Sequence, residues 1–531
     1  MNHWFKHLSI LFLLGQSTNM ACDTEPSAQC MVTADVESEH IDLQRISAFE
    51  GPTDKTVSLV GYGQATPAST RVRLLERIDA DQNESTFTSD GALETISDAQ
   101  GRFSLSIPQT LVVVSVQFIP PNGEMETISF RVRNRESAFT CFATSISETG
   151  TLPNDTHIAS CDGQRMGYVV TSADATLEAA APAGDQPTQE IHFFPPQEQV
   201  GANPYHGAWH PTKNLTAVSL FGTSTVAIIN PCTGEKLFHS PPWSQEGDQF
   251  LLTAEPPLQL TTPIDVNGDG APDPTVTSMF PRSPQALTWI DDALWVIFSG
   301  FIEGATPEQK AVFGPAALVI YHWNGTSLDI SRVVALPHQN PQSVTAGNDD
   351  SVWISYSGVV QMNDAGFFID TPGYLEKRSA DDASLLHVIS MDHFGPSTPA
   401  ISADKIVTGS LLNSQIAILP THAESIQEAT VIEVEGAQTE SLFDVALWGT
   451  DVAFITQFST DRVHVVDLQR DILNPFPFPE KGIDLSRGRS IFHGAQSIDI
   501  NQNSSEGDLG VVLLGLSAEL VFLDFRQVFG P

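Results

Sequence analysis

The chain has 531 residues, of which 41% are hydrophobic, so it is long enough for two or three domains with buried cores. It carries 64 Asp and Glu against 25 Lys and Arg, a formal net charge of -39. A surface this acidic repels phosphate groups, which excludes nucleic acids and anionic membrane surfaces from the expected partners.

The first 21 residues are expected to be a signal peptide. Lys6 precedes a short apolar run at residues 8–15, and a small polar stretch then leads to Cys22. The run is too short to span a bilayer, and no later stretch reaches the roughly 18 apolar residues of a membrane helix. Ala21-Cys22 resembles the processing site of bacterial lipoproteins. This implies an exported protein, periplasmic or at the cell surface, that touches the membrane only through lipid on Cys22; an ordinary signal peptide is the alternative.

Four further cysteines remain if Cys22 carries lipid, and an even number fits an oxidising compartment. Cys141 and Cys161 are close enough in sequence to clip one loop, which leaves Cys30 for Cys232. Other pairings remain open at this point.

Residues 22–50 are polar and are expected to form a tether, followed by a β-sandwich over residues 51–136. Alternating runs such as VSLVGY, RFSLSIP and LVVVSVQFI are separated by turn residues, as in antiparallel sandwiches. The turn at residues 97–101 resembles that of bacterial immunoglobulin-like and carboxypeptidase-regulatory-like modules, which implies a domain that supports its neighbour. The run AAAPAGDQPTQE indicates that residues 137–200 are a connector, which would also hold the disulfide loop.

From residue 201 to residue 531 the chain repeats itself. PQALTWIDDALWVIFSG from Pro284 and PQSVTAGNDDSVWISYSG from Pro341 share an opening strand, an Asp-Asp turn, a Trp-containing strand and a closing Ser-Gly. The spacing of the units fits four-stranded blades with loop insertions. Weaker copies start at Ala208, Gly395, Ser441 and Ala495.

With third strands such as TVAIINPCTGE, these units resemble the secreted β-propellers of the YVTN type. The resemblance implies an all-β protein, with an N-terminal β-sandwich followed by a six- or seven-bladed β-propeller. The last unit ends one strand short, and an open blade would expose a sheet edge. Residues 190–194 (EIHFF) are expected to supply the missing strand.

Residues 265–273 read DVNGDGAPD and match the opening of an EF-hand-like calcium loop. The run resembles the calcium loops of dockerin and thrombospondin-type repeats, although Val276 stands where a bidentate glutamate is expected. A solvated turn is the alternative. We expect calcium to stabilise this long inter-blade loop, with ligands from Asp265, Asn267, Asp269, Ala271 and Asp273.

Histidines recur just before the innermost strands of the units, in loops that converge on one mouth of a propeller channel. Imidazole binds transition metals and changes charge near neutral pH, so a ring of imidazoles could hold a metal, an anion or a sugar. The other interpretation is that they tie blade loops together by hydrogen bonds. The candidate rim comprises His206, His210, Arg282, His338, Asn340, His393 and His493.

The sequence contains no G-x-S-x-G elbow, H-E-x-x-H motif, phosphate loop or dinucleotide fingerprint. We therefore expect a non-catalytic binding or scaffold protein of the cell envelope, whose propeller face meets a protein or glycan partner. The alternative is a metal-dependent hydrolase at the same rim. It would resemble the calcium-dependent, lactonase-like propellers, which hold a metal in the channel beside a histidine base.

Overall fold

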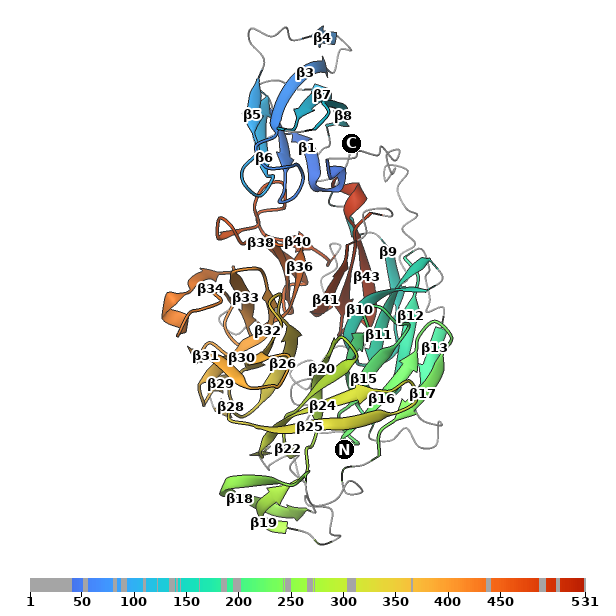
Figure 1. The fold of residues 1–531 in the computed structure, drawn as a ribbon, viewed down its shortest axis with the longest axis vertical. Helices are drawn as coiled ribbons and strands as arrows, with labels where there is room; N and C mark the ends of the chain where they lie inside the picture. The colour runs from blue at the N-terminus through green and yellow to red at the C-terminus, as the bar shows by residue number, and fades with distance from the viewer. Residues whose placement is uncertain are drawn as a thin grey trace.

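The computed structural model describes most of residues 41–529 and shows a chain built from antiparallel β-sheets (Figure 1). No helix within this part is long and apolar enough to cross a membrane. The segments within 41–529 that are left out are 51–55, 80–83, 87–92, 108–110, 122, 133–138, 140–141, 144, 162, 183–188, 194–201, 242, 244–249, 265–270, 272, 303–311, 364–365, 436–440, 487–492 and 503–506.

The N-terminal domain consists of two antiparallel sheets that share one apolar core. The side chains of its strands alternate between buried and exposed, so each sheet turns one face to the other. The first sheet follows the 3-10 helix η1 (Leu43–Arg45) and pairs β1 (Ile46–Glu50), β2 (Val57–Gly61) and β6 (Phe103–Ile107). The second sheet contains β3 (Arg71–Asp79), β4 (Glu84–Thr86), β5 (Glu94–Ile96), β7 (Leu111–Ile119) and β8 (Glu126–Arg131).

This domain begins earlier than the sequence predicts. The sequence predicts a tether at residues 41–50, but they form η1 and β1 and bury Ile46 and Ala48 in the shared core. Leu105 from one sheet and Phe118 from the other meet in the same core. The opposite face of β1 is buried as well, since Ser47 and Phe49 are fully covered and Phe49 packs against the propeller.

The propeller consists, within the described residues, of seven blades, each an antiparallel sheet with its first strand innermost (Figure 1). The first three blades contain β10 (Pro153–Cys161), β11 (Gln164–Thr171), β12 (Thr176–Ala180) and β13 (Gln189–His192); β14 (Pro204–Trp209), β15 (Thr216–Leu220), β16 (Thr225–Asn230) and β17 (Glu235–His239); and β20 (Pro284–Ile290), β21 (Ala293–Phe298), β24 (Ala316–Trp323) and β25 (Leu328–Leu336).

Blades 4 and 5 contain β26 (Pro341–Ala346), β27 (Ser351–Tyr356), β30 (Gly373–Ser379) and β31 (Leu385–Asp392); and β32 (Pro396–Ile401), β33 (Lys405–Ser410), β34 (Gln415–Pro420) and β35 (Thr430–Glu433), with the 3-10 helix η4 (Ile426–Glu428) before the last strand. Blades 6 and 7 contain β36 (Leu442–Trp448), β37 (Val452–Gln457), β38 (Arg462–Asp467), β39 (Ile472–Leu473) and the extra β40 (Ile483–Asp484); and β41 (Ala495–Asn501), β42 (Leu509–Leu514), β43 (Glu519–Asp524) and β9 (Ser145–Glu148).

The ring of blades is closed by a strand from upstream of blade 1. Innermost strands of adjacent blades contact one another in cyclic order, and β41 of blade 7 contacts β10 of blade 1. β43 pairs with β9, which becomes the outer strand of blade 7. An upstream strand therefore completes the last blade, as the sequence predicts, but residues 190–194 do not supply it. They contain part of β13, the outer strand of blade 1.

Residues 137–200 are not a connector. β9 and all of blade 1 lie in this stretch, so the propeller begins at residue 145 instead of 201. The Ala-rich run is misleading because small side chains often mark linkers, whereas Leu177 and Ala179 are buried against blade 2 and Ala180 is buried against blade 7. These residues form the strand β12 because both of its faces pack against neighbouring blades, and not because of their local propensity.

Three two-stranded hairpins are inserted before or within blades 3 and 4. The longest lies between blades 2 and 3 and projects from the ring (Figure 1). The hairpins pair β18 (Leu252–Ile264) with β19 (Asp273–Met279), β22 (Phe301–Ile302) with β23 (Val312–Phe313), and β28 (Val360–Asn363) with β29 (Gly366–Ile369).

An aromatic cluster joins the N-terminal domain to blades 6 and 7. It continues through the C-terminal turn η5 (Phe525–Gln527). Across the same boundary, the Tyr62 hydroxyl donates to the Phe476 carbonyl at 2.8 Å, and Gly63 N donates to the Asp451 carboxylate at 3.1 Å. The two domains are therefore packed as one body. The inter-domain cluster comprises Phe49, Tyr62, Phe139, Phe142, Trp448, Phe454, Phe478, Phe525 and Phe529.

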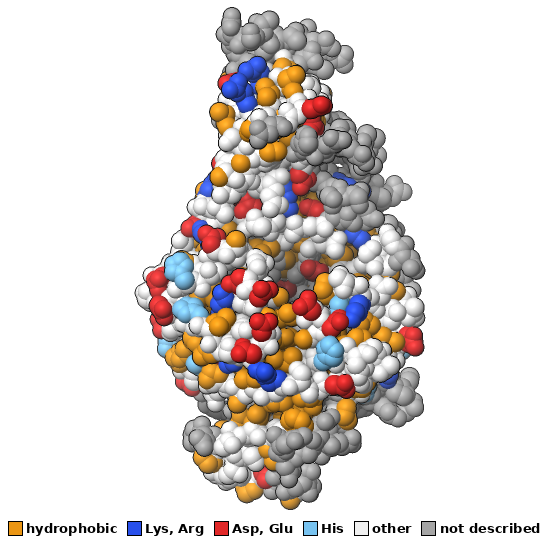
Figure 2. Space-filling model, in the orientation of Figure 1, with side chains coloured by type: hydrophobic (Ala, Val, Ile, Leu, Met, Phe, Trp, Pro, Cys, Tyr) orange, Lys and Arg blue, Asp and Glu red, His pale blue; other side chains and the backbone are white. Residues whose placement is uncertain are grey.

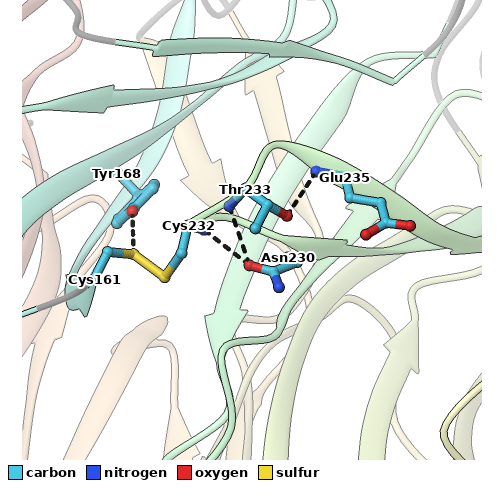
Figure 3. Close-up of a disulfide and its surroundings, with 6 residues drawn as sticks. All are labelled: Cys161, Tyr168, Asn230, Cys232, Thr233 and Glu235. Atoms are coloured by element: carbon cyan, nitrogen blue, oxygen red, sulfur yellow. Dashed lines mark hydrogen bonds between the residues drawn. A yellow bond between two sulfur atoms is a disulfide. The ribbon is translucent and has the colours of Figure 1, made fainter.

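A disulfide joins blade 1 to blade 2 (Figure 3). Cys161, at the end of β10, bonds Cys232, in the turn between β16 and β17. The expected pairs Cys141–Cys161 and Cys30–Cys232 are therefore wrong. Closeness in sequence favoured Cys141, but the ring places the end of β10 beside the next blade. Cys30 and Cys141 themselves lie outside the described residues.

Candidate functional site

All seven innermost strands begin with the same irregularity. In each, the register of pairing with the second strand shifts near the strand start, as at a β-bulge. A bulge bends a strand and re-aims its side chains. The seven strand starts therefore form a collar around one end of the channel, called here the channel mouth.

Three aspartates of the innermost strands fasten neighbouring blades: Asp155 and Asp444 lie near the strand starts, and Asp499 lies farther along β41. Each accepts a backbone N–H from the innermost strand of the next blade, which fixes the direction of its carboxylate. The bonds run from Gly207 N to Asp155 at 2.8 Å, from Ile498 N to Asp444 at 2.9 Å, and from Ile158 N to Asp499 at 2.7 Å. These carboxylates thus connect blades 6, 7, 1 and 2, around the place where β9 closes the ring.

Ser497 bridges two of these carboxylates. Its Oγ lies 2.9 Å from Asp155 Oδ1 and 3.0 Å from Asp444 Oδ2, and it also accepts the N–H of Thr156 at 3.3 Å. A hydroxyl has one proton to donate. Both short contacts are hydrogen bonds only when one of the two carboxyl groups is itself protonated and donates to Ser497.

The buried surroundings of Asp444 favour a proton on its carboxyl group. Burial, together with the nearby Asp155 charge, raises the pKa of Asp444 to about 6 against the hydrogen bonds that lower it. Burial likewise raises the pKa of Asp499 to about 6. Across the described residues, neither group forms an ion pair with a Lys or Arg. The innermost strands therefore hold acidic groups that titrate near pH 6.

Two imidazoles lie beside Asp155. His206 Nε2 is 3.7 Å from Asp155 Oδ2, and the ring is partly exposed. His157 is only 7% exposed and stacks on Tyr168, and among the described residues neither of its ring nitrogens has a hydrogen-bond partner. Burial lowers the pKa of His157 to about 4, so the ring is neutral above that pH.

The pH dependence of stability provides a test of these assignments. Because the folded pKa of Asp444 lies above its unfolded value, its contribution to stability is complete below pH 4 and is lost as pH rises through 6. Asp444→Asn removes that loss of stability, because an asparagine does not ionise. We expect the unfolding free energy of the variant, relative to the wild type, to improve by at most about 3 kcal/mol between pH 4 and pH 7.

Urea titrations of both proteins at several pH values measure this difference, and Asp381→Asn on the exposed surface is the matched control. The pH profile of the wild type alone does not isolate Asp444. Burial lowers the pKa values of His157 and His464 to about 4, so these two groups change stability in the opposite direction over the same pH range. Equal pH profiles for the two variants would contradict a raised pKa at Asp444.

The candidate rim predicted from sequence does not assemble into one site. His206 reaches the channel mouth, but His210 follows the other end of β14, roughly 13 Å away at the rise of a strand. His210 is buried, with Nε2 3.1 Å from the Asp292 carboxylate and Nδ1 accepting the N–H of Thr212. This histidine fastens blade 2 to the first turn of blade 3.

Asn340 is also occupied by its own blade. It is buried with a φ of 54°, and its amide donates to Ser357 Oγ and to the Gly358 carbonyl, both at 2.8 Å. The ring of His338 stacks on Tyr374 at 3.7 Å between centroids. The contacts of these two residues favour the interpretation that rim residues hold the blade loops together.

The remaining rim residues are spread around the ring. His393 is exposed, and its Nδ1 lies 3.1 Å from the Ile369 carbonyl. The backbone N–H of the buried His493 donates to Asp461 at 2.8 Å. Arg282 is partly exposed in the loop before blade 3, where its carbonyl accepts an N–H from Gly300. Among the described residues, no three acidic, His or Cys side chains are placed to hold one metal ion.

Amide side chains and aromatic rings complete the mouth. Gln285 donates to Gln342 of the next blade at 2.8 Å, and Gln342 donates in turn to Asn340. The sequence presents both glutamines in its repeated Pro-Gln pair. Four partly exposed rings follow one another across blades 2 and 3, with centroids 5.5 to 5.6 Å apart: Tyr205, Phe221, Phe301 and Phe313.

The predicted calcium loop falls at the tip of the β18–β19 hairpin. Asp265, Asn267 and Asp269 lie outside the described residues, whereas Asp273 begins β19 and pairs with Ile264. Ala271 lies just before that strand. Val276 and Met279 form a small cluster with Ile302 of the β22–β23 hairpin, and Leu252 at the start of β18 packs against blades 2 and 3.

If calcium binds this tip, its removal is expected to act locally. Because the hairpin packs against the ring at its base and not at its tip, chelation should expose the tip to proteolysis while the melting temperature of the propeller changes by less than about 2 °C. Limited proteolysis with and without chelator, with the cleavage site identified by mass spectrometry, checks this. Asp265→Asn in calcium should give the chelated pattern, and an unchanged pattern would remove calcium from this loop.

Together, the cyclic sheet order and the bulged collar define a seven-bladed β-propeller with a docked two-sheet N-terminal domain. No protein-family model and no curated protein matches the sequence. Among solved structures, the chain is similar to the hydrazine synthase of Kuenenia stuttgartiensis, with a TM-score of 0.45 and 9% identity over 70% of this chain and 95% of the other.

It is also similar to the β-propeller domain of Myceliophteria thermophila Cps50 (Swd1), with a TM-score of 0.44 and 8% identity over 70% of this chain and 96% of that one. A streptogramin B lyase gives a TM-score of 0.42 and 10% identity over 72% of this chain and 95% of the other. Because these likenesses are distant, the function has to be argued from the residues of this chain.

Proposed function

We propose that this chain is a non-catalytic binding protein of the cell envelope, and that the channel mouth is its partner-binding face. The observation that carries the proposal is that several rim side chains are engaged in contacts within the propeller. His210 and Asn340 form internal hydrogen bonds and His338 stacks on Tyr374, so these residues support the face. What the mouth offers a partner is polar amides, carboxylates and partly exposed aromatic rings, the composition of a recognition surface.

Export is supported by the disulfide between Cys161 and Cys232, because such bonds persist in oxidising compartments. A lipid on Cys22, outside the described residues, would then hold the protein at a membrane. Acidic side chains gather around the middle of the propeller face in Figure 2, and the net charge is -39. Such a surface keeps the propeller off an anionic bilayer and leaves its face open to a soluble or envelope partner.

A photo-crosslinking amino acid tests the proposal in cells that make the protein. Leu516, 39% exposed in the β42–β43 turn at the mouth end of blade 7, is one position for it. Ile472, 44% exposed on the outer strand β39, is the matched control away from the mouth. A discrete adduct at Leu516 alone supports the proposal. Equal labelling at both positions, or no adduct at either, contradicts it.

The hydrolase alternative rests on one contact. His206 and Asp155 form the imidazole–carboxylate pair that reaches the mouth, at 3.7 Å. Turnover of lactone or ester substrates that disappears in His206→Gln, but not in His210→Gln, would replace the binding proposal with an enzyme.

A further inference from the structure

The innermost strands carry an unbalanced charge. All seven are described in full and contain Asp155, Asp444 and Asp499 but neither Lys nor Arg. Within the described structure, none of the three carboxylates has a Lys or Arg within 4 Å. A carboxylate in a confined site without a counter-ion is costly, and proteins resolve that cost with a proton or with a bound cation.

A second, independent observation concerns the imidazoles. Within the part of the chain that the structure describes, both nitrogens of the buried His157 lack a hydrogen-bond partner, as does Nδ1 of His206. The edge of the His157 ring lies against Gly207, since a Cβ there would be 3.3 Å from His157 Nδ1, and the Gly207 N–H is bonded to Asp155. Unsatisfied buried nitrogens beside carboxylates that lack a Lys or Arg partner point to a hydrogen-bonding group that completes the site.

The chemistry of that group follows from the geometry. No three His, Cys, Asp or Glu side chains within the described part are placed to hold a metal ion. An organic cation needs no such cage, because its N–H donors can be shared between two carboxylates. Its carbon stem would lie against the partly exposed rings of Tyr205 and Phe221, whose faces attract a cation.

We propose that the channel mouth binds a lysine or arginine side chain presented by a polypeptide partner, with Asp155 and Asp444 as the anionic pair that receives it. The proposal rests on the proposed function, for which it names the chemistry of the partner. The overall charge of -39 would attract a basic partner from a distance and speed its association.

Protons compete with this ligand. The proton that Ser497 requires on one carboxyl group leaves when a cation binds, so binding weakens as pH falls. The titratable groups facing the site are Asp155, His157, Tyr205, His206, Asp444 and Asp499. Burial lowers the pKa of His157 to about 4, so this imidazole stays neutral between pH 5 and pH 7.5, and the pH dependence comes from the aspartates.

The test uses the full chain with fluorescent tetraarginine, tetralysine and tetraglutamine peptides at 150 mM salt, with Kd measured at pH 5 and pH 7.5. We expect the basic peptides to bind at least tenfold more tightly at pH 7.5, and the neutral peptide not to bind. Asp155→Asn should weaken binding at least tenfold. Asp381→Asn, which removes one exposed charge elsewhere, should change it less than twofold.

Ser497→Ala provides a second variant if Asp155→Asn does not fold, and it should weaken the pH dependence. Equal losses in Asp155→Asn and Asp381→Asn would show that binding reflects general surface charge, and the proposal would fall. If neither basic peptide binds while the Leu516 crosslink persists, the cation proposal falls and the binding function stands. If both fail, both are wrong.

Discussion

Trp448→Ala is expected to lower the free energy of unfolding by about 3–5 kcal/mol, as large-to-small changes of buried aromatics do. The side chain is fully buried at the end of β36, with ring centroids 4.6 Å from Phe529 and 5.6 Å from Tyr62. Its Nε1 donates to the Asp508 carboxylate at 2.6 Å, and the Arg45 guanidinium lies 4.8 Å from the ring centroid. One indole thus holds the N-terminal domain, blade 6 and the C-terminal turn together.

The consequence specific to this position is loss of docking between the domains. Trp353→Ala is the matched control, because Trp353 is as deeply buried but lies between blades 4 and 5, and its Nε1 has no hydrogen-bond partner in the described structure. Urea unfolding gives both stabilities, and limited proteolysis between the domains separates the two cases. We expect Trp448→Ala to be cleaved there at sub-denaturing urea and Trp353→Ala to remain intact. Equal cleavage would mean that the aromatic cluster does not fix the domain arrangement.

The repeated units predict the fold well where local signals and packing agree. The Pro-Gln pair, the Asp-Asp turn and the Trp-containing strand become β20 and β21 in blade 3, and β26 and β27 in blade 4. Blade 1 carries none of these signals, and its third strand reads as a small-residue linker. Its strands are fixed by burial against blades on either side, which a single sequence does not display.

The channel site was beyond sequence reasoning for a related reason. Asp155, Asp444 and Ser497 stand in three different blades, separated by up to 342 residues, and only ring closure brings them together. The available signal was modest: an acid or serine at the third position of the innermost strand, in PND, LFD and AQS. Histidine chemistry is versatile and favours a binding ring, yet His210 and His338 are engaged in contacts within the propeller.

Whether two residues that are close in sequence meet in the propeller depends on how far apart they lie along the strand. His206 and His210 are close in sequence and were grouped, but β14 carries them to opposite ends of the blade. Cys141 and Cys161 were paired on the same reasoning. In a ring of blades, residues meet when they occupy the same level of neighbouring strands, and sequence spacing within one unit does not report that level.

The disulfide leads to the second large expected effect. Cys161 and Cys232 are 71 residues apart, and in the chain-entropy account a cross-link over such a loop stabilises the folded state by about 4 kcal/mol. The double variant Cys161→Ser/Cys232→Ser should therefore lose roughly that much in urea unfolding under non-reducing conditions. A double variant avoids leaving one thiol that could pair with Cys141 or Cys30.

A peptide map of the wild type tests whether the loss of stability comes from the Cys161–Cys232 disulfide. Digestion without reductant should give one linked peptide pair containing residues 161 and 232. A linked pair containing residues 141 and 161 would overturn the assignment, because β10 would then be fastened to the segment before β9 and not to blade 2. Wild type and double variant should also become equally stable once reductant is added, since the bond is then lost from both. If the variant remains weaker in reductant, the two serines have disturbed packing around Tyr168, whose hydroxyl lies 3.0 Å from Cys161 Sγ, and the entropic account fails.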